Sequence, residues 1–120
     1  MLTWLGVACF GALGAAARFR VDALVSARFP GDFPIGTFVV NLSGTVPLGL
    51  LVGAGVSDRT LLVLGTGFLG GYTTFSTWMV ESERLGEGGQ VRLVLANLFL
   101  SLLAGLALAA LAWHVGRAIA

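Results

Sequence analysis

Charged residues divide the chain into four uncharged, mostly apolar stretches. These stretches are residues 2–17, 33–57, 60–80 and 93–116. A helix that crosses a hydrocarbon core of about 30 Å needs about 20 apolar residues, and the last three stretches reach that length. The first reaches it if Arg18, which ends it, points into protein or extends toward the membrane surface. The pattern therefore predicts four membrane-spanning segments, at approximately residues 2–25, 35–56, 60–80 and 92–115.

The architecture that we expect is an all-α membrane protein, with residues 1–120 forming one four-helix transmembrane domain. Lipid offers the backbone no hydrogen bonds, so each span should be mainly helical, and the short alternating segments of a β-barrel are absent. Ala15-Ala16-Ala17 resembles the cleavage site of a secretory signal peptide, but the positively charged region that should precede the apolar stretch is missing. We therefore interpret the first stretch as a membrane helix.

Composition supports the membrane assignment. Hydrophobic residues make up 57% of the chain and charged residues only 11%, whereas soluble domains are about 25% charged. So few charges cannot cover the surface of a water-soluble enzyme of this size. The net charge is +1 and no block of like charge occurs, so the sequence shows no nucleic-acid footprint.

The arginines specify the orientation of the helices only weakly. With four spans, Arg59 and Arg117 lie on one side of the membrane, and the other side carries Arg20, Arg28, Arg84 and Arg92, together with Arg18 if it reaches the membrane surface. The positive-inside rule would place the second group in the cytoplasm. The small bias also suits a protein that inserts in both orientations.

Polar residues follow one face of the second span. Thr37, Asn41 and Thr45 are spaced at i, i+4 and i+8, which aligns them on a helix. Asn41 is the costly member, because an unpaired amide in an apolar medium costs about 2–7 kcal/mol. Its side chain either clamps two helices together through hydrogen bonds or binds a transported ligand, and the spacing favours neither role.

The fourth span repeats this pattern with Asn97, Ser101 and Gly105. Two helices that each carry a polar stripe could line a narrow wet path, or the stripes could pair in a dry interface. Near the end of the span, His114 stands beside Trp113, which is typical of an anchor at the membrane interface.

The third span is a poor helix core, since residues 65–78 contain four glycines and four threonines. We expect a break near Gly70-Gly71, close to the bilayer centre, where carbonyls freed from the helix could hold a cation. The alternative is close helix packing through Gly67 and Gly71. Beyond this point, Phe75 and Trp78 share a face, and their ring edges could complement an anion or simply pack.

Three segments read GALGAAARF at residues 11–19, GTFVVNLSG at residues 36–44 and GFLGGYTTFST at residues 67–77. On these segments the chain resembles the CrcB or Fluc family of small bacterial fluoride channels. Together with the region around Ser101, these segments cover all four predicted spans. The third segment is the most specific, because apolar composition alone would not generate it.

The resemblance implies an antiparallel, dual-topology homodimer with two pores and a third helix broken in mid-membrane. It implies a structural sodium ion at the dimer centre, held by the backbone carbonyls of Gly70 and Thr73 from both subunits. Asn41 would donate its amide to fluoride, and Phe75 would present its ring edge to the permeation path. The other positions that match the family's path and vestibule are Thr37, Ser76, Thr77, Trp78, Ser101 and Arg18.

Three positions depart from the family's pattern. Trp78 stands where the second aromatic residue is usually Phe, and its indole is larger and adds an N–H donor. Asn97 stands where the polar track of the fourth span often has Tyr, and Gly105 replaces a hydroxyl residue. The completeness of that track is therefore open.

The function implied is passive export of fluoride across the cell inner (plasma) membrane, which relieves fluoride toxicity, with fluoride, membrane lipid and a second copy of the chain as partners. One alternative is a small dual-topology multidrug or cation exporter, but that mechanism needs a carboxylate inside the membrane, and no predicted span interior contains one. Another is a non-transporting membrane subunit, which would leave Asn41 and the third span unexplained. We do not expect an enzyme, because no nucleophile–base pair or metal cluster is apparent.

Overall fold

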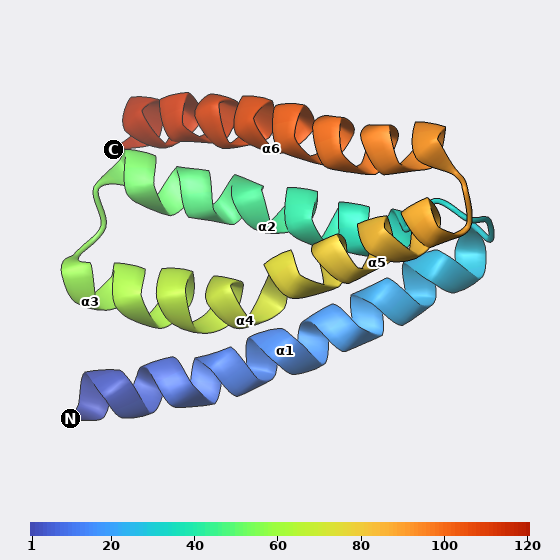
Figure 1. Cartoon of the computed structure of the whole chain (residues 1–120). Helices are drawn as coiled ribbons and strands as arrows, with labels where there is room; N and C mark the ends of the chain where they lie inside the picture. The colour runs from blue at the N-terminus through green and yellow to red at the C-terminus, as the bar shows by residue number, and fades with distance from the viewer.

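The computed structural model describes residues 1–120 and is helical throughout, without strands. Figure 1 shows how the helices lie side by side. In chain order they are α1 (Leu2–Arg28), α2 (Ile35–Ala54), α3 (Asp58–Thr60), the π-helix η1 (Leu61–Leu69), α4 (Gly70–Tyr72), α5 (Phe75–Glu87) and α6 (Val91–Ile119).

Three of these helices, α1, α2 and α6, are long and apolar enough to cross a membrane. The stretch at residues 60–80 is instead built from the end of α3, then η1, α4 and the beginning of α5. The molecule measures 46 × 30 × 23 Å, and its longest dimension matches the thickness of a bilayer with its headgroups, about 40–45 Å. These features are those of a multi-pass membrane protein.

Glycines allow the column from α3 to α5 to pack closely on α1. A Cβ atom on Gly67 of η1 would lie 3.1 Å from the carbonyl oxygen of Val7 in α1. At Gly71 it would collide with the carbonyl oxygen of Gly11, and at Gly14 with that of Phe68. Close packing through Gly67 and Gly71, one of the two interpretations of this segment, is therefore present in the fold.

The other layer of the molecule pairs α2 with α6, which run alongside each other in Figure 1. Small residues again set the distance between the helices. A Cβ on Gly49 of α2 would lie 2.6 Å from the carbonyl oxygen of Ala109, and one on Gly116 of α6 would lie 2.6 Å from that of Leu50. Larger side chains at these positions would separate the helices.

The column from α3 to α5 is interrupted by two residues with extended backbone, Thr73 (ψ 158°) and Thr74 (ψ 122°). Gly70 and Gly71, where we expected a break, are helical and form the start of α4. The interruption lies after these glycines because Thr74 is the N-cap of the next helix. Its hydroxyl accepts a hydrogen bond from the backbone amide of Thr77 at 3.2 Å. A second irregularity precedes it, since the amide of Gly70 bonds to the carbonyl of Gly65, five residues back, as in a π-helix.

A single chain leaves much of its surface uncovered. Only 15 of the 120 residues are buried, and the accessible surface is 7527 Å², compared with about 6,100 Å² for a compact soluble protein of this mass. The exposed side chains include large apolar residues on every long helix. This surface requires lipid or another protein chain as its cover.

Candidate functional site

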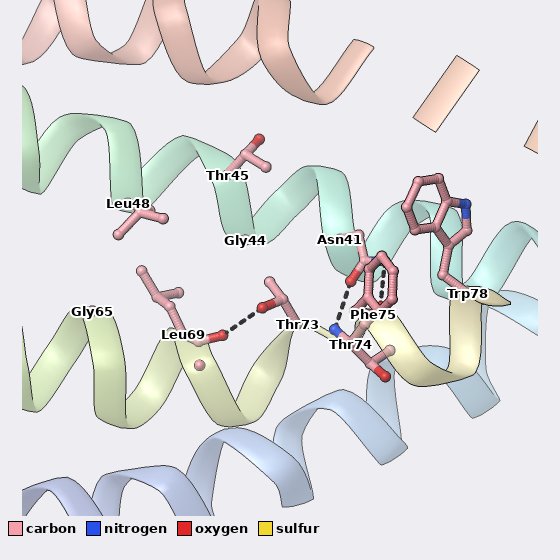
Figure 2. Close-up of a pocket in the computed structure, with 11 residues that line it drawn as sticks. Asn41, Gly44, Thr45, Leu48, Gly65, Leu69, Thr73, Thr74, Phe75 and Trp78 are labelled. Carbon is pink, nitrogen blue, oxygen red and sulfur yellow. Dashed lines mark hydrogen bonds between the residues drawn. The ribbon is translucent and has the colours of Figure 1, made fainter. Parts of the chain in front are cut away.

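Asn41 of α2 holds the interruption between α4 and α5 through both ends of its amide (Figure 2). Its Nδ2 donates to the carbonyl oxygen of Thr74 at 2.9 Å, and its Oδ1 accepts from the amide of Thr74 at 2.8 Å. Asn41 is therefore a clamp between segments. An amide nitrogen carries two hydrogens, so one donor remains for a ligand.

The largest concentration of predicted site residues surrounds this pair. A cavity of about 330 Å³, which we call the Asn41 cavity, lies between α2, η1 and the interruption. Its lining includes Asn41, Gly70, Thr73, Phe75 and Trp78. No charged side chain is among the residues that line it.

Two aromatic rings stand at one end of the Asn41 cavity, as Figure 2 shows. The rings of Phe75 and Trp78 meet edge to face, with their centroids 5.7 Å apart and their planes at 75°. Phe75 is 70% exposed. The indole Nε1 of Trp78 donates to the carbonyl oxygen of Asn97 at 3.0 Å, so the N–H that distinguishes Trp from Phe is engaged with α6.

A second cavity, of about 280 Å³, adjoins the first through Thr74, which lines both. We call it the Arg18 cavity. It brings together three predicted residues, Arg18, Thr37 and Thr77, and adds Asp22, which the sequence analysis did not single out. Asp22 follows Arg18 by four residues in α1, so the two side chains share a helix face.

A third cavity, of about 260 Å³, lies between α2, α5 and α6 and is lined by Asn41, Thr45, Trp78, Ser101 and Gly105 among others. We call it the Ser101 cavity. The hydroxyl of Ser101 is buried and has no hydrogen-bond partner, so it is free to serve a ligand or water. Ser76, by contrast, is exposed on α5 and lines none of the three cavities.

Two backbone carbonyls beside the interruption are released from helical hydrogen bonding. In a continuous helix, the carbonyl of Gly70 would accept the amide of Thr74, and that of Thr73 would accept the amide of Thr77. The first amide donates to Asn41 Oδ1 and the second to the hydroxyl of Thr74. Backbone oxygens freed in this way are ligands that hard cations accept, whereas the chain has no cluster of three or more His, Cys, Asp or Glu side chains for a metal.

Sequence reasoning missed two residues of α5, Glu81 and Ser82, which line none of the three cavities. One carboxylate oxygen of Glu81 is buried without a partner, and the residue stands one position beyond the predicted span. The hydroxyl of Ser82 donates to the carbonyl of Trp78 at 2.8 Å and accepts from Asn97 Nδ2 at 2.8 Å. The spacing of Ser82 four residues after Trp78 could have indicated that both face α6.

Comparison with known proteins gives consistent matches over nearly the whole chain. The family model described as CrcB-like protein, Camphor Resistance (CrcB), matches residues 5–113. A fluoride-specific ion channel FluC 2 from Mycolicibacterium paratuberculosis is 51% identical over 102 residues, which are 85% of this chain and 84% of the relative. The FluC 2 channel of Mycobacterium tuberculosis H37Rv is 47% identical over 95% of this chain and 90% of its own length. FluC 1 of Geobacillus kaustophilus is 44% identical, with 94% and 97% covered. The chain therefore belongs to the CrcB-like protein family.

Proposed function

We propose that the chain forms a fluoride-selective channel through which fluoride leaves the cell passively. The similar proteins named above are fluoride-specific ion channels, and none of those names describes an enzyme. The observation that carries the proposal is that Asn41, whose amide has one unused hydrogen, lines a cavity with no charged lining. Fluoride is small and strongly hydrated, so its path needs donors that replace water without a full charge that would trap it.

The three cavities suggest an order of contacts along the path. Arg18 attracts the anion at the entrance, and the hydroxyls of Thr37 and Thr77 begin to replace its water. Asn41 takes the ion over, since it lines both of the other cavities. The positive ring edges of Phe75 and Trp78 and the free hydroxyl of Ser101 then complete the path. Ser76 serves it only if a second chain closes over its exposed position.

The driving force for export is the membrane potential. A negative cell interior favours outward movement of each anion by about 2.3 kcal/mol per 100 mV. No nucleotide site or proton relay is required. In a plasma membrane, such a channel would relieve fluoride toxicity.

We also propose that the residues 60–80 cross the membrane as a fourth, interrupted span. The column from α3 to α5 runs beside the long helices in Figure 1. Non-helical backbone is tolerated within a membrane where protein satisfies its polar groups, and Asn41 satisfies both polar groups of Thr74.

The active form that we propose is an antiparallel homodimer. One chain exposes about 1,400 Å² more than a compact protein of its mass, which exceeds the area of about 800 Å² that each partner contributes to a standard-size interface. The exposure of Phe75 and Gly70 beside the Asn41 cavity indicates that a second copy would close it. The weak asymmetry of the arginines is compatible with dual topology.

A sodium ion at the centre of this dimer would be held by the carbonyl oxygens of Gly70 and Thr73. The donors that would occupy these oxygens in a helix are engaged elsewhere, and oxygen is the donor atom that hard cations prefer. When bound, the ion would supply positive potential beside the anion path and would brace the two chains.

The test is an efflux measurement on the purified protein in liposomes. Vesicles loaded with potassium fluoride or potassium chloride are diluted into a buffer that contains only an impermeant anion, and a potassium ionophore sets the voltage. We expect fluoride to leave far faster than chloride, and protein-free vesicles to retain both. Equal release of the two anions, or release of neither, would refute the proposed function.

A further inference from the structure

Three hydrogen bonds join Trp78 of α5 to α6 in a closed ring. The indole Nε1 of Trp78 donates to the backbone carbonyl of Asn97 at 3.0 Å. The side-chain Nδ2 of Asn97 donates to the hydroxyl of Ser82 at 2.8 Å. That hydroxyl donates in turn to the carbonyl of Trp78 at 2.8 Å. The ring thus ties both the side chain and the backbone of Trp78 to a single residue of α6.

The ring lies in the protein interior. Asn97 is fully buried and Ser82 nearly so. Hydrogen bonds in such surroundings are strong, and a donor that loses its partner there pays the full cost of desolvation. Loss of the Ser82 hydroxyl would therefore leave Asn97 Nδ2 without a partner and favour a different side-chain arrangement.

Only one member of the ring touches the proposed path. Trp78 lines both the Asn41 cavity and the Ser101 cavity, whereas Ser82 and Asn97 line neither. Trp78 is therefore the hydrogen-bonded contact through which Ser82 and Asn97 reach the path. The indole also sets the position of Phe75, because the two rings meet edge to face at 5.7 Å.

We infer that Ser82 and Asn97 are positioning residues for the ion path, fixing the indole of Trp78 and through it the ring of Phe75. The inference rests on the proposed function for the identity of the ion. It also explains what Trp contributes at this position. The indole N–H anchors the ring to α6 and leaves the anion to be met by the ring edge and by Asn41.

A double-mutant cycle on fluoride efflux tests the inference. Ser82→Ala and Ser82→Thr are compared in the native chain and in a Trp78→Phe chain, which lacks the indole donor. In the native chain, Ser82→Ala should slow efflux about fivefold, a size typical of residues that share one hydrogen-bond network, and Ser82→Thr should restore it by keeping the hydroxyl. In the Trp78→Phe chain, Ser82→Ala should change efflux less than about twofold. Equal slowing in both chains would overturn the inference, because Ser82 would then act independently of the indole.

A fluorescence measurement separates this inference from the proposed function. The chain has three tryptophans, so the double substitution Trp4→Phe and Trp113→Phe leaves Trp78 as the only indole reporter. Ser82→Ala should lower the anisotropy of its emission and shift that emission to the red, and Ser82→Thr should do neither. If the native chain releases no fluoride, the proposed function fails, but this measurement still tests whether the hydrogen-bonded ring fixes the indole of Trp78. Identical emission in the Ala and Thr variants would overturn the positioning role.

Discussion

Replacing Asn41 by Asp separates the two roles that the structure gives to this side chain. Aspartate keeps an oxygen for the amide of Thr74, now at 2.8 Å from Asn41 Oδ1, but removes the nitrogen that donates to the Thr74 carbonyl at 2.9 Å. It also places a full negative charge beside a cavity that has none. The substitution therefore retains half of the clamp and eliminates the donor proposed for fluoride.

The charge dominates the expected effect. Two like charges about 4 Å apart, at an effective dielectric constant of about 20, repel by about 4 kcal/mol. Since about 1.4 kcal/mol corresponds to a factor of ten in rate, fluoride efflux should fall about a thousandfold. The lost hydrogen bond should cost about 1–3 kcal/mol of stability, and the second carboxylate oxygen, facing the carbonyl oxygen of Thr74, should add to that cost, so assembly of the variant is measured alongside efflux.

Efflux from liposomes measures this effect, with size-exclusion chromatography reporting whether the variant assembles like the native chain. Thr45→Val is the matched control. Thr45 lines the same cavity from the same helix, but its hydroxyl is engaged with the carbonyl of Leu42 at 2.8 Å, so its loss should change efflux far less. If Asn41→Asp conducts at the native rate, Asn41 is only a clamp and the proposed path is wrong.

Three further predictions follow from the same contacts. Phe75→Leu removes the ring edge from the Asn41 cavity and should slow fluoride efflux at least about tenfold, and unchanged efflux would exclude the ring from the path. Gly71→Ala drives a Cβ into the carbonyl of Gly11 and should lower the thermal midpoint of unfolding in detergent by several degrees. Gly86→Ala is the control and should leave the midpoint unchanged, because the nearest atom to its Cβ is 3.8 Å away on a side chain. Equal midpoints for the two variants would contradict the close packing of α1. Exchange of sodium for N-methylglucamine during purification should dissociate the proposed dimer and reduce efflux, and an intact, conducting dimer would argue against the cation site.

The sequence predicts the long helices well because lipid imposes a simple rule. An uncharged run of membrane length must be helical, and the runs 33–57 and 93–116 correspond to α2 and α6, while the shorter run 2–17 corresponds to the first part of α1. The predicted ends differ by a few residues, as at α1, which continues to Arg28 rather than stopping near residue 25. Capping and the polar membrane boundary set those ends, and neither has a strong local signal here.

The interruption is harder to place because a distant residue determines it. Glycine content indicated Gly70-Gly71, whereas the extended residues are Thr73 and Thr74. Glycine lowers the stability of a helix but does not supply the hydrogen bonds that replace a helical turn. Asn41, 33 positions away from Thr74, supplies them, and local spacing carries no information about that contact.

The choice between clamp and ligand for Asn41 could not be made from spacing for a related reason. An amide offers more hydrogen-bonding positions than one partner uses, and only the geometry shows that Thr74 takes one hydrogen and the oxygen. Ser82, one of the residues that sequence reasoning missed, has the same character. A serine within an amphipathic helix is commonplace, and its importance appears only when Asn97 is found against it.

The two proposed ion sites depend on one peptide group. The amide of Thr74 bonds to Asn41 Oδ1 and for that reason does not bond to the carbonyl of Gly70. The carbonyl of Thr74 holds Asn41 Nδ2 in place, so that an amide with one unused hydrogen is fixed in the wall of the cavity. The contact that orients a donor toward an anion is thus the contact that releases an acceptor for a cation. A continuous helix would remove both the oriented amide donor and the released carbonyl acceptor. The proposed sites therefore require a polar side chain in α2 together with the interruption between α4 and α5. The cost of burying the Asn41 amide and the cost of burying the Thr74 peptide group are offset by the hydrogen bonds between them.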